Sequence, residues 1–441
     1  MDKNTLSNYG WIVVMILCLS VLIALATPFG GYIRAGVENT VQGLFETEDA
    51  ALGKVLDDMG IVPSVDELQA KHKFDYYSTF RGAVADVNAN TIGVNADCDK
   101  EDATAGVYTD NGEVFVVLLK DTTEMASISI NENMTINFGG HKLSISAKTG
   151  LQMMSCSNKT LTLDGSLKGS ELITNSTGNN NVFAVVFFKN NVNVKNMKIS
   201  SVAENGVSVG INVGPNGNVN IEKSEIQAYS SIQARAFNHE GSGAIANDSK
   251  FIGYSNYLIT DDGKSYKASS GGIYSTGELT LNNCYAMGSH SGVQAKGITY
   301  INGGIYEGYG HGGFYFSGST IYAENAISRK CNMIDGYLTD IISNGSGMYI
   351  GGGGTANNII VNLNNCTLYG DRRPIVMRGT DGEQDNTLRM SNCNINLDYT
   401  ETAVRIDNDT HKLYLGKGNN FTAEKTSRPS SVILTDEIYC Q

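Results

Sequence analysis

The chain contains few prolines and few charged residues. Of its 441 residues, five are proline and only 17% are Asp, Glu, Lys or Arg. The 32 Lys and Arg residues are outnumbered by 45 Asp and Glu residues, which gives a net charge of −13. Because nucleic-acid binding requires clustered Lys and Arg, this balance argues against a nucleic-acid partner. The 50 glycines suit β-sheets, whose turns need positive φ and whose ladders tolerate few prolines.

Helical spacing is also missing from the C-terminal two-thirds of the chain. Apolar residues there alternate at every second position in short segments, and Asn, Gly and Asp separate the segments. Such segments without intervening helices exclude a doubly wound α/β fold. The chain is therefore predicted to be all-β.

One short sequence motif recurs along this part of the chain. Residues 361–368, 388–395 and 279–284 share alternating apolar residues followed by Asn and Cys, and weaker copies extend back to residues 136–143. A repeat of roughly 20 to 30 residues is typical of a solenoid. We expect about eleven coils that pair in parallel at about 4.8 Å, in a rod roughly 50 Å long. The prediction is a right-handed parallel β-helix over residues 114–441.

The repeat places four of the eight cysteines in one inward column. In alignment, this column contains His141, Ser166, Met197, Ser224, Ser249, Cys284, Gly304, Cys331, Cys366, Cys393 and Gly418. Side chains on neighbouring coils run parallel, so their Cβ atoms stay about 4.8 Å apart, whereas a disulfide needs about 3.8 Å. We therefore expect free buried thiols, and no zinc site, because a zinc ion needs converging ligands. A ladder of stacked amides is expected from the preceding residues, Asn283, Asn365 and Asn392.

Residues 11–29 form an apolar run long enough to span a bilayer. An uncleaved anchor is one interpretation, and a signal peptide cleaved near Ala26 is another. A third is a pilin-like subunit, because the run continues as an amphipathic segment to residue 45 and a globular part follows. This layout resembles that of type IV pilins, although Met15 stands where a pilin has Glu. All three interpretations place the residues after 45 outside the membrane.

Residues 46–113 show no clear repeat and are expected to form a stalk and an N-terminal cap. An uncapped solenoid would expose a strand edge, so a cap is physically required. Ser64 and Glu67 have the spacing of a capping box, which predicts a helix that runs through His72, Phe74, Tyr77 and Phe80. The apolar residues 114–119 are predicted to begin the solenoid.

A second sequence motif, which lies between the copies of the Asn-Cys motif, predicts one outer face of the solenoid. Because strand side chains alternate, its apolar residues point inward, namely Ile273, Val293, Phe314, Met348, Ile375 and Val404. The residues that follow them point outward and, with their neighbours, form the candidate binding set of Tyr274, His290, Gln294, Tyr315, Tyr349, Arg372 and Arg405. Lys296, Arg378 and His311 lie beside this set.

These residue types suit the recognition of sugars. Tyrosine rings in a row stack on sugar rings, while His, Lys and Arg donate hydrogen bonds to hydroxyl and carboxylate groups. Stacked coils also form a long regular groove that matches an extended polymer. A purely structural role is the alternative, because Tyr is a good strand former.

The repeating coils, the Asn residues at the turns and the inward Cys column resemble the pectate-lyase-like β-helix superfamily, over about residues 114–441. That superfamily contains polysaccharide lyases, glycoside hydrolases, viral tailspikes and noncatalytic surface proteins. The resemblance therefore implies a fold but does not fix an activity.

Two catalytic patterns of the superfamily are matched only in part. Polygalacturonases carry Asn-Thr-Asp, Asp-Asp, Gly-His-Gly and Arg-Ile-Lys in that order. This chain has Asp261-Asp262, His311 and Arg405 in the last three places, but it lacks the first motif, and Asp407 replaces the lysine.

The segment from Arg372 to Arg378 is one residue longer than the pectate lyase motif Arg-x-Pro-x-x-Arg. The extra residue moves the second Arg to the opposite face of the strand. No acidic cluster for Ca²⁺ stands next to Lys296 or Arg378. His290 and His311 are expected about 5 Å apart on adjacent coils, but a third metal ligand is missing.

The sequence thus predicts a membrane-anchored cell-surface protein that binds polysaccharide or glycoconjugate without a cofactor. Secretion after signal cleavage is the alternative location. The first alternative function is a polysaccharide lyase or glycoside hydrolase with His311, Lys296 or Arg378 as catalytic residues, and only a lyase would need Ca²⁺. The second is a noncatalytic pilin-like structural subunit. The sequence leaves open whether the chain forms a homo-oligomer.

Overall fold

The computed structural model describes most of the chain after residue 62. Ser64–Gln441 form one compact unit. The apolar run at residues 11–29 lies outside the described residues, as do Asp261, Asp262, Cys331 and Arg372. Within the described residues, no helix combines the length and the apolar character needed to cross a membrane. The described residues are 63–255, 270–308, 311–330, 346–351, 358–370, 373–379, 385–397, 402–422, 426–437 and 439.

Three long sheets, named A, B and C, make up most of this unit. Sheet A contains β1 (Asp75–Tyr77), β2 (Ala105–Asp110), β3 (Glu113–Leu118), β6 (Met134–Asn137), β9 (Thr160–Asp164), β12 (Asn191–Lys195), β15 (Asn218–Glu222), β18 (Gly243–Asn247), β21 (Glu278–Asn282), β24 (Thr299–Asn302), β27 (Thr320–Glu324), β30 (Ile360–Asn364), β33 (Thr387–Ser391), β36 (Lys412–Leu415) and β38 (Val432–Leu434). Sheet B contains β4 (Thr122–Glu124), β7 (Lys142–Ser146), β10 (Glu171–Ser176), β13 (Lys198–Ala203), β16 (Glu225–Ser230), β19 (Lys250–Ser255), β22 (Tyr285–Gly288), β25 (Ile305–Gly308), β28 (Ile327–Lys330), β31 (Thr367–Gly370), β34 (Asn394–Leu397) and β37 (Asn420–Phe421). Sheet C contains β5 (Ile128–Ser129), β8 (Thr149–Met153), β11 (Val182–Phe187), β14 (Val207–Val213), β17 (Gln233–His239), β20 (Gly271–Ser275), β23 (Ser291–Ala295), β26 (Gly312–Phe316), β29 (Met348–Ile350), β32 (Ile375–Met377) and β35 (Val404–Ile406).

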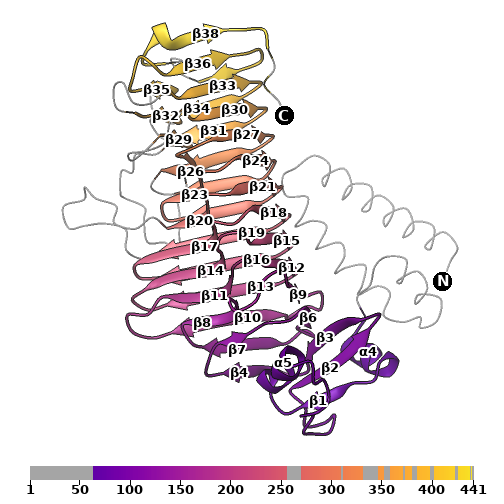
Figure 1. Cartoon of the computed structure of the whole chain (residues 1–441). Coiled ribbons are helices and arrows are strands. Elements are labelled where there is room, and N and C mark those ends of the chain that lie inside the picture. The colour runs from indigo at the N-terminus through magenta and orange to yellow at the C-terminus, as the bar shows by residue number, and fades with distance from the viewer. Residues whose placement is uncertain are drawn as a thin grey trace, which may run out of the picture. The chain divides into compact units, whose positions relative to one another are not determined.

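The chain winds through the three sheets in turn, so that each coil adds one strand to A, then B, then C. From β3 onward, every strand pairs in parallel with the strand of the next coil. The described residues contain eleven complete three-strand coils, from β3–β4–β5 to β33–β34–β35. Figure 1 shows the strands of successive coils stacked one above another. The predicted all-β class and parallel solenoid are therefore confirmed.

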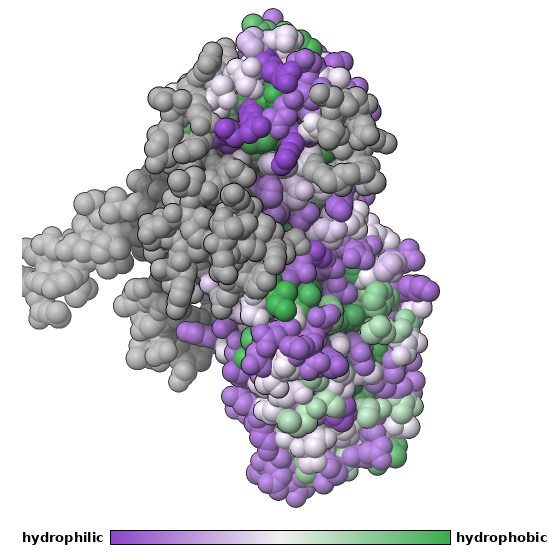
Figure 2. Space-filling model, turned by 90° about the vertical axis from the view of Figure 1, so that its left-hand side faces the viewer, coloured by the Kyte–Doolittle hydropathy of each residue, from purple (hydrophilic) through white to green (hydrophobic). Residues whose placement is uncertain are grey.

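Two-residue alternation places the apolar side chains inside the coils. In β21, Leu279 and Leu281 are fully buried, whereas Thr280 between them points outward. The in-register neighbours of Leu281, which are Ala246 and Ile301, are buried as well. On the face drawn in Figure 2, the described hydrophobic residues form small patches separated by polar ones. One continuous core thus runs through the coils, and the outward positions are available for other roles.

A single left-handed residue makes the turn from sheet A to sheet B in many coils. Asn283 has φ of 51° and Asn365 has φ of 50°. The Asn283 amide donates to Asp248 Oδ1 at 2.8 Å, and the Asn365 amide donates to Asn325 Oδ1 at 2.6 Å, each in the preceding coil. Asn tolerates this backbone region better than most residues, and its amide satisfies a partner there. Of the three predicted residues, only Asn365 makes the expected amide-to-amide contact. The partner of Asn283 is a carboxylate, and the Asn392 amide donates to Asn364 Oδ1 at 3.0 Å instead of to Asn365.

The inward column that follows this turn differs from the prediction at three positions. Backbone hydrogen bonds place Ser170, not Ser166, beside Met197, because four extra residues lengthen the turn after β9. Ala326 takes the place assigned to Cys331, since the Thr367 N–H donates to the Ala326 carbonyl oxygen at 2.9 Å. At the last position, Asn419 replaces Gly418.

The described cysteines in the column have free thiols, as expected. Cys284, Cys366 and Cys393 are buried and carry no disulfide. Burial raises the pKa of the Cys284 thiol to about 12. These side chains therefore behave as small hydrophobic groups in the core.

The cap contains two helices with a strand between them, where the sequence predicted one helix. Ser64 forms the expected capping box with Glu67, but α4 (Val65–Lys71) ends before His72, which is extended. The chain then forms β1, which pairs antiparallel with β2, and α5 (Phe80–Asn88) follows. The prediction of one long helix is wrong, because residues after Lys71 form β1 and pair with β2 instead.

The cap closes the N-terminal end of the solenoid. Tyr77 and Phe80 are fully buried and belong to the same apolar core as Val116 of β3 and Ile128 of β5. Figure 1 shows α5 beside the first strands of the sheets. The parallel pairing starts at β3, where residues 114–119 were predicted to begin the solenoid. At the other end, a short 3-10 helix, η1 (Pro429–Ser431), precedes β38.

Candidate functional site

The outer face of sheet C brings most of the predicted site residues into one column. The strand register aligns Tyr274 with Gln294, Gln294 with Tyr315, and Tyr315 with Tyr349. The column continues through Val376 to Arg405. The inward neighbours of these residues are all buried, namely Ile273, Val293, Phe314, Met348, Ile375 and Val404. The alternation predicted for this face is therefore present in the structure.

Two histidines and two tyrosines form an aromatic cluster at the centre of this face. The ring centroids of His290 and His311 lie 4.2 Å apart. His311 stacks on Tyr315 at 5.1 Å and meets Tyr349 edge to face at 4.7 Å. Tyr315 and Tyr349 are 5.4 Å apart with an interplanar angle of 74°. The four rings therefore come from three consecutive coils and pack as one unit.

The aromatic surface is less open than the sequence suggested. Tyr274, Gln294 and Tyr315 are half-buried, and Tyr349 is only 7% exposed. Burial, and then the nearby Tyr349, raise the pKa of Tyr315. Tyr349 thus offers little free ring surface, because its neighbours cover it. Tyr274 and Tyr315, which are half-buried, retain more exposed ring surface.

Cationic side chains flank the aromatic cluster. Arg378 is exposed and its Nη1 donates to the Tyr349 hydroxyl at 2.9 Å. This hydrogen bond raises the pKa of Arg378. At the other end of the column, the Arg235 guanidinium lies 4.1 Å from the Tyr274 ring centroid, and Lys296 Nζ lies 5.8 Å from it. Both contacts are within the range of cation–π attraction.

The two histidines of the cluster are neutral at neutral pH. Burial, and then proximity to His311, lower the pKa of His290 to about 3. Burial and then Arg378 lower the pKa of His311 to about 4. The Nδ1 atoms of both rings are buried without a hydrogen-bond partner among the described residues. Each ring keeps some exposed surface, so the cluster is partly open to solvent.

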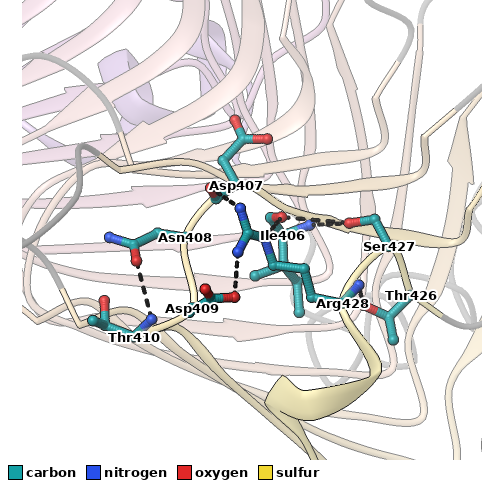
Figure 3. Close-up of polar contacts among 8 residues, drawn as sticks. All are labelled: Ile406, Asp407, Asn408, Asp409, Thr410, Thr426, Ser427 and Arg428. Atoms are coloured by element: carbon teal, nitrogen blue, oxygen red, sulfur yellow. Dashed lines mark hydrogen bonds and ion pairs between the residues drawn. The ribbon is translucent and has the colours of Figure 1, made fainter.

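Arg405 in the middle of β35 pairs with a carboxylate that follows the strand. Its Nε donates to Asp407 Oδ1 at 2.6 Å. Figure 3 shows the segment after β35, where Arg428 donates to the carbonyl oxygens of Ile406 and Asp407 and pairs with Asp409. The position where a polygalacturonase has lysine therefore holds a carboxylate that faces Arg405.

The structure describes no metal centre in this region. Among the described residues, no three His, Cys, Asp or Glu side chains gather closely enough to hold a metal ion. Asp407, which follows β35, is paired with Arg405 of the column.

Two groups of outward residues were missed by the sequence analysis. On sheet C, Arg235 donates to Asn238 Oδ1 at 2.7 Å, and Asn238 donates to Asn212 Oδ1 at 2.7 Å, which extends the column toward the cap. On sheet A, Tyr300 and Tyr322 stack with a centroid distance of 5.4 Å and an angle of 7°. The signal for the second group was present, because each of these tyrosines stands between two inward residues.

Comparison with known proteins identifies no relative of this chain. No family model, no curated protein and no solved structure was found to match it. Its function is therefore argued from the chemistry of its own surface.

Proposed function

We propose that the outer face of sheet C binds a polysaccharide or glycoconjugate. The observation that carries this proposal is the register that aligns Tyr274, Gln294, Tyr315 and Tyr349 on consecutive strands. Consecutive coils lie about 4.8 Å apart, so the column repeats its ring and amide groups along the axis. A ligand with its own repeating units makes the same contact several times on such a surface.

The charges beside the column favour an acidic sugar polymer. Arg235, Lys296 and Arg378 lie along the column, although the chain as a whole carries a charge of −13. Guanidinium and ammonium groups donate charge-assisted hydrogen bonds to carboxylates and sulfates. The neutral histidines add hydrogen-bonding edges without adding charge.

The proposed location follows from the sequence and the fold together. We propose that the solenoid is a right-handed parallel β-helix of the pectate-lyase-like kind, held outside the cytoplasm by the apolar run at residues 11–29. Such a position would expose sheet C to extracellular glycans. Burial protects the thiols of Cys284, Cys366 and Cys393 from oxidation, whereas the free thiols of Cys98 and Cys156 are partly exposed, so the cysteines do not decide the location.

A polysaccharide lyase is the second candidate function. The observation that favours it is the contact between His311 and the Tyr315–Tyr349 pair beside Arg378. The His311 imidazole is unprotonated at neutral pH and can act as a general base, although its pKa of about 4 makes it a weak one. Arg378 can hold the carboxylate of a uronic acid. Binding without cleavage requires only the same contacts, so it is the simpler proposal.

The experiment is affinity electrophoresis of the full-length chain through native gels that each contain one polysaccharide. The detergent is a polyoxyethylene type, because a glycoside detergent would compete for the site. We expect retardation in polygalacturonate, alginate or a glycosaminoglycan, without a cleared zone. The Tyr274→Ala/Tyr315→Ala variant should lose this retardation, with its affinity for the polysaccharide reduced at least about tenfold.

The control is Tyr369→Ala, which removes a tyrosine that is 44% exposed on the outer face of sheet B. It should keep the wild-type retardation. A cleared zone that disappears in His311→Ala would establish depolymerisation at this site instead, and a product that carries a C=C double bond would identify a lyase and not a hydrolase. Equal retardation of the wild type and the double variant in every gel would refute the sheet C site.

A further inference from the structure

A second outward column runs along sheet A, on a different side of the solenoid from the proposed site. The register aligns Asn193 with Asn220, Ile245 and Thr280, and then with Tyr300 and Tyr322. Amide and hydroxyl groups thus occupy the coils near the middle of the sheet. The aromatic pair follows in the next two coils toward the C-terminus.

A missing side chain hollows this surface. Gly243 stands in register between Asn218 and Glu278, where every neighbour projects a side chain. The resulting groove has a volume of about 430 Å³ and is lined by residues of β12, β15, β18 and β21, among them Asn193, Asn220, Ile245, Glu278 and Thr280. A Cβ atom at Gly243 would meet only Asn218 Oδ1, at 3.5 Å. The glycine is thus not required by its surroundings, and its main effect is the open space.

The lining of the groove is polar but almost uncharged. Glu278 is the single ionisable residue among those that line it. Asn220 is half-buried in β15 and lines the groove, so its amide lies within reach of a ligand there. Ile245 is 48% exposed and supplies an apolar floor. Cationic groups, which flank the tyrosines of sheet C, are missing from this lining.

The stacked tyrosines extend the groove along the axis. Tyr300 lies in the strand next to Thr280, and its ring is nearly parallel to that of Tyr322 at 5.4 Å. Both tyrosines are half-buried, so part of each ring faces solvent. A ligand that fills the groove would continue onto these rings with the same strand spacing.

We propose that the outer face of sheet A is a second binding site, for a neutral glycan chain that lies along the solenoid axis. Amide, hydroxyl and carboxylate groups match the donors and acceptors of sugar hydroxyls, and the aromatic rings match the apolar faces of sugar rings. The lone Glu278 disfavours an anionic chain, because no cation in the lining offsets it. This site is independent of the proposed site on sheet C.

The test fills the groove without removing any existing side chain. Gly243→Asn adds the residue type that stands next to it in β15, and the backbone there needs no positive φ. Affinity electrophoresis of the full-length chain in xylan, glucomannan, laminarin and dextran gels measures the effect. We expect the wild type to be retarded in at least one gel, and Gly243→Asn to lose at least about tenfold in affinity.

A second variant, Tyr300→Ala/Tyr322→Ala, should show the same loss, whereas Tyr369→Ala and the sheet C variant should not. Gly243→Asn should unfold at the wild-type temperature or above, because a strand glycine is replaced. No retardation of the wild type in any neutral gel would overturn the proposal. Unchanged retardation of both sheet A variants would overturn it as well, whatever the result for sheet C.

Discussion

At the scale of single residues, the turn from sheet A to sheet B explains why asparagine recurs in the repeat. Asn196, Asn283, Asn325, Asn365 and Asn392 all have φ between 50° and 56°. Most side chains pay roughly 1–2 kcal/mol in this region, whereas Asn pays less because its short amide bonds locally. The residue that marks the repeat in the sequence is therefore the one that the backbone demands at the turn.

Another residue with an unusual environment is His239 at the end of β17. It is fully buried, its Nδ1 lies 2.9 Å from Ser275 Oγ, and its Nε2 has no partner among the described residues. Burial lowers its pKa to about 4, below the 6.5 of an unperturbed imidazole. The unfolded chain thus binds a proton between these values while the folded chain does not. The stability that His239 contributes is complete above pH 6.5 and is lost as the pH falls toward 4.

We predict that the stability gap between the wild type and His239→Gln depends on pH. At pH 7.5, His239→Gln should be the less stable protein, because it disturbs the core and the contact with Ser275. Between pH 7.5 and 5, the gap should narrow by about 1–2 kcal/mol, because only the wild type loses the histidine contribution. Urea unfolding at several pH values measures it. A gap that stays constant over this range would contradict the assignment.

Residue patterns predicted the interior better than the surface. Inward residues such as Phe314 and Met348 followed from alternation alone, because a buried column requires apolar side chains at every second position. How far Tyr349 is covered could not be predicted, since it depends on the ring of His311 in the neighbouring coil and on Arg378. The groove at Gly243 was also missed, because a glycine in a strand appears in the sequence as an interruption and not as a site.

At the scale of elements, turn length and strand pairing account for the errors. The turn after β9 is four residues longer than the turn after β12. The sequence alignment therefore placed Ser166 in the inward column, where the structure has Ser170. In the cap, the capping box correctly located the start of α4, whereas its end is set by the antiparallel pairing of β1 with β2. Local signals thus fixed where elements begin, and distant pairing decided where they stop.

The helix α5 has a clear role in the stability of the cap. Phe80 at its start is fully buried in the core that continues into the first coils. We predict that Phe80→Ala costs about 3–5 kcal/mol by opening a cavity at this junction. The exposed end of the first coil should then promote association, seen as increased light scattering below the unfolding temperature.

The control for this variant is Val94→Ala, which lies in the cap but is 71% exposed. Its stability should stay within about 0.5 kcal/mol of the wild type. Equal stability of Phe80→Ala and Val94→Ala would show that α5 does not close the solenoid.

At the scale of the whole molecule, the two outer faces differ in charge. Sheet C presents Arg235, Lys296 and Arg378 around its tyrosines, whereas the groove of sheet A contains Glu278 alone. Both faces belong to one chain with a net charge of −13, so the cations of sheet C stand out from their surroundings. Charge, more than shape, would then direct different glycans to different sides.

We predict that salt separates the two sites. Raising NaCl from about 0.05 M to about 0.5 M shortens the screening length from roughly 14 to 4 Å. Retardation in polygalacturonate should weaken accordingly, and retardation in a neutral glycan should change little. Affinity electrophoresis of the wild type over a salt series measures both. The same salt response in both gels would contradict the difference in charge between the sites.

The buried thiols can report the order in which the coils of the solenoid open. Cys284 lies in the seventh of the eleven coils, and Cys366 and Cys393 lie in the last two. A thiol reagent reaches each of them only while its own coil is open, because the core excludes it. The order in which the three are alkylated under native conditions would therefore report whether the solenoid frays from its C-terminal end or opens as a whole.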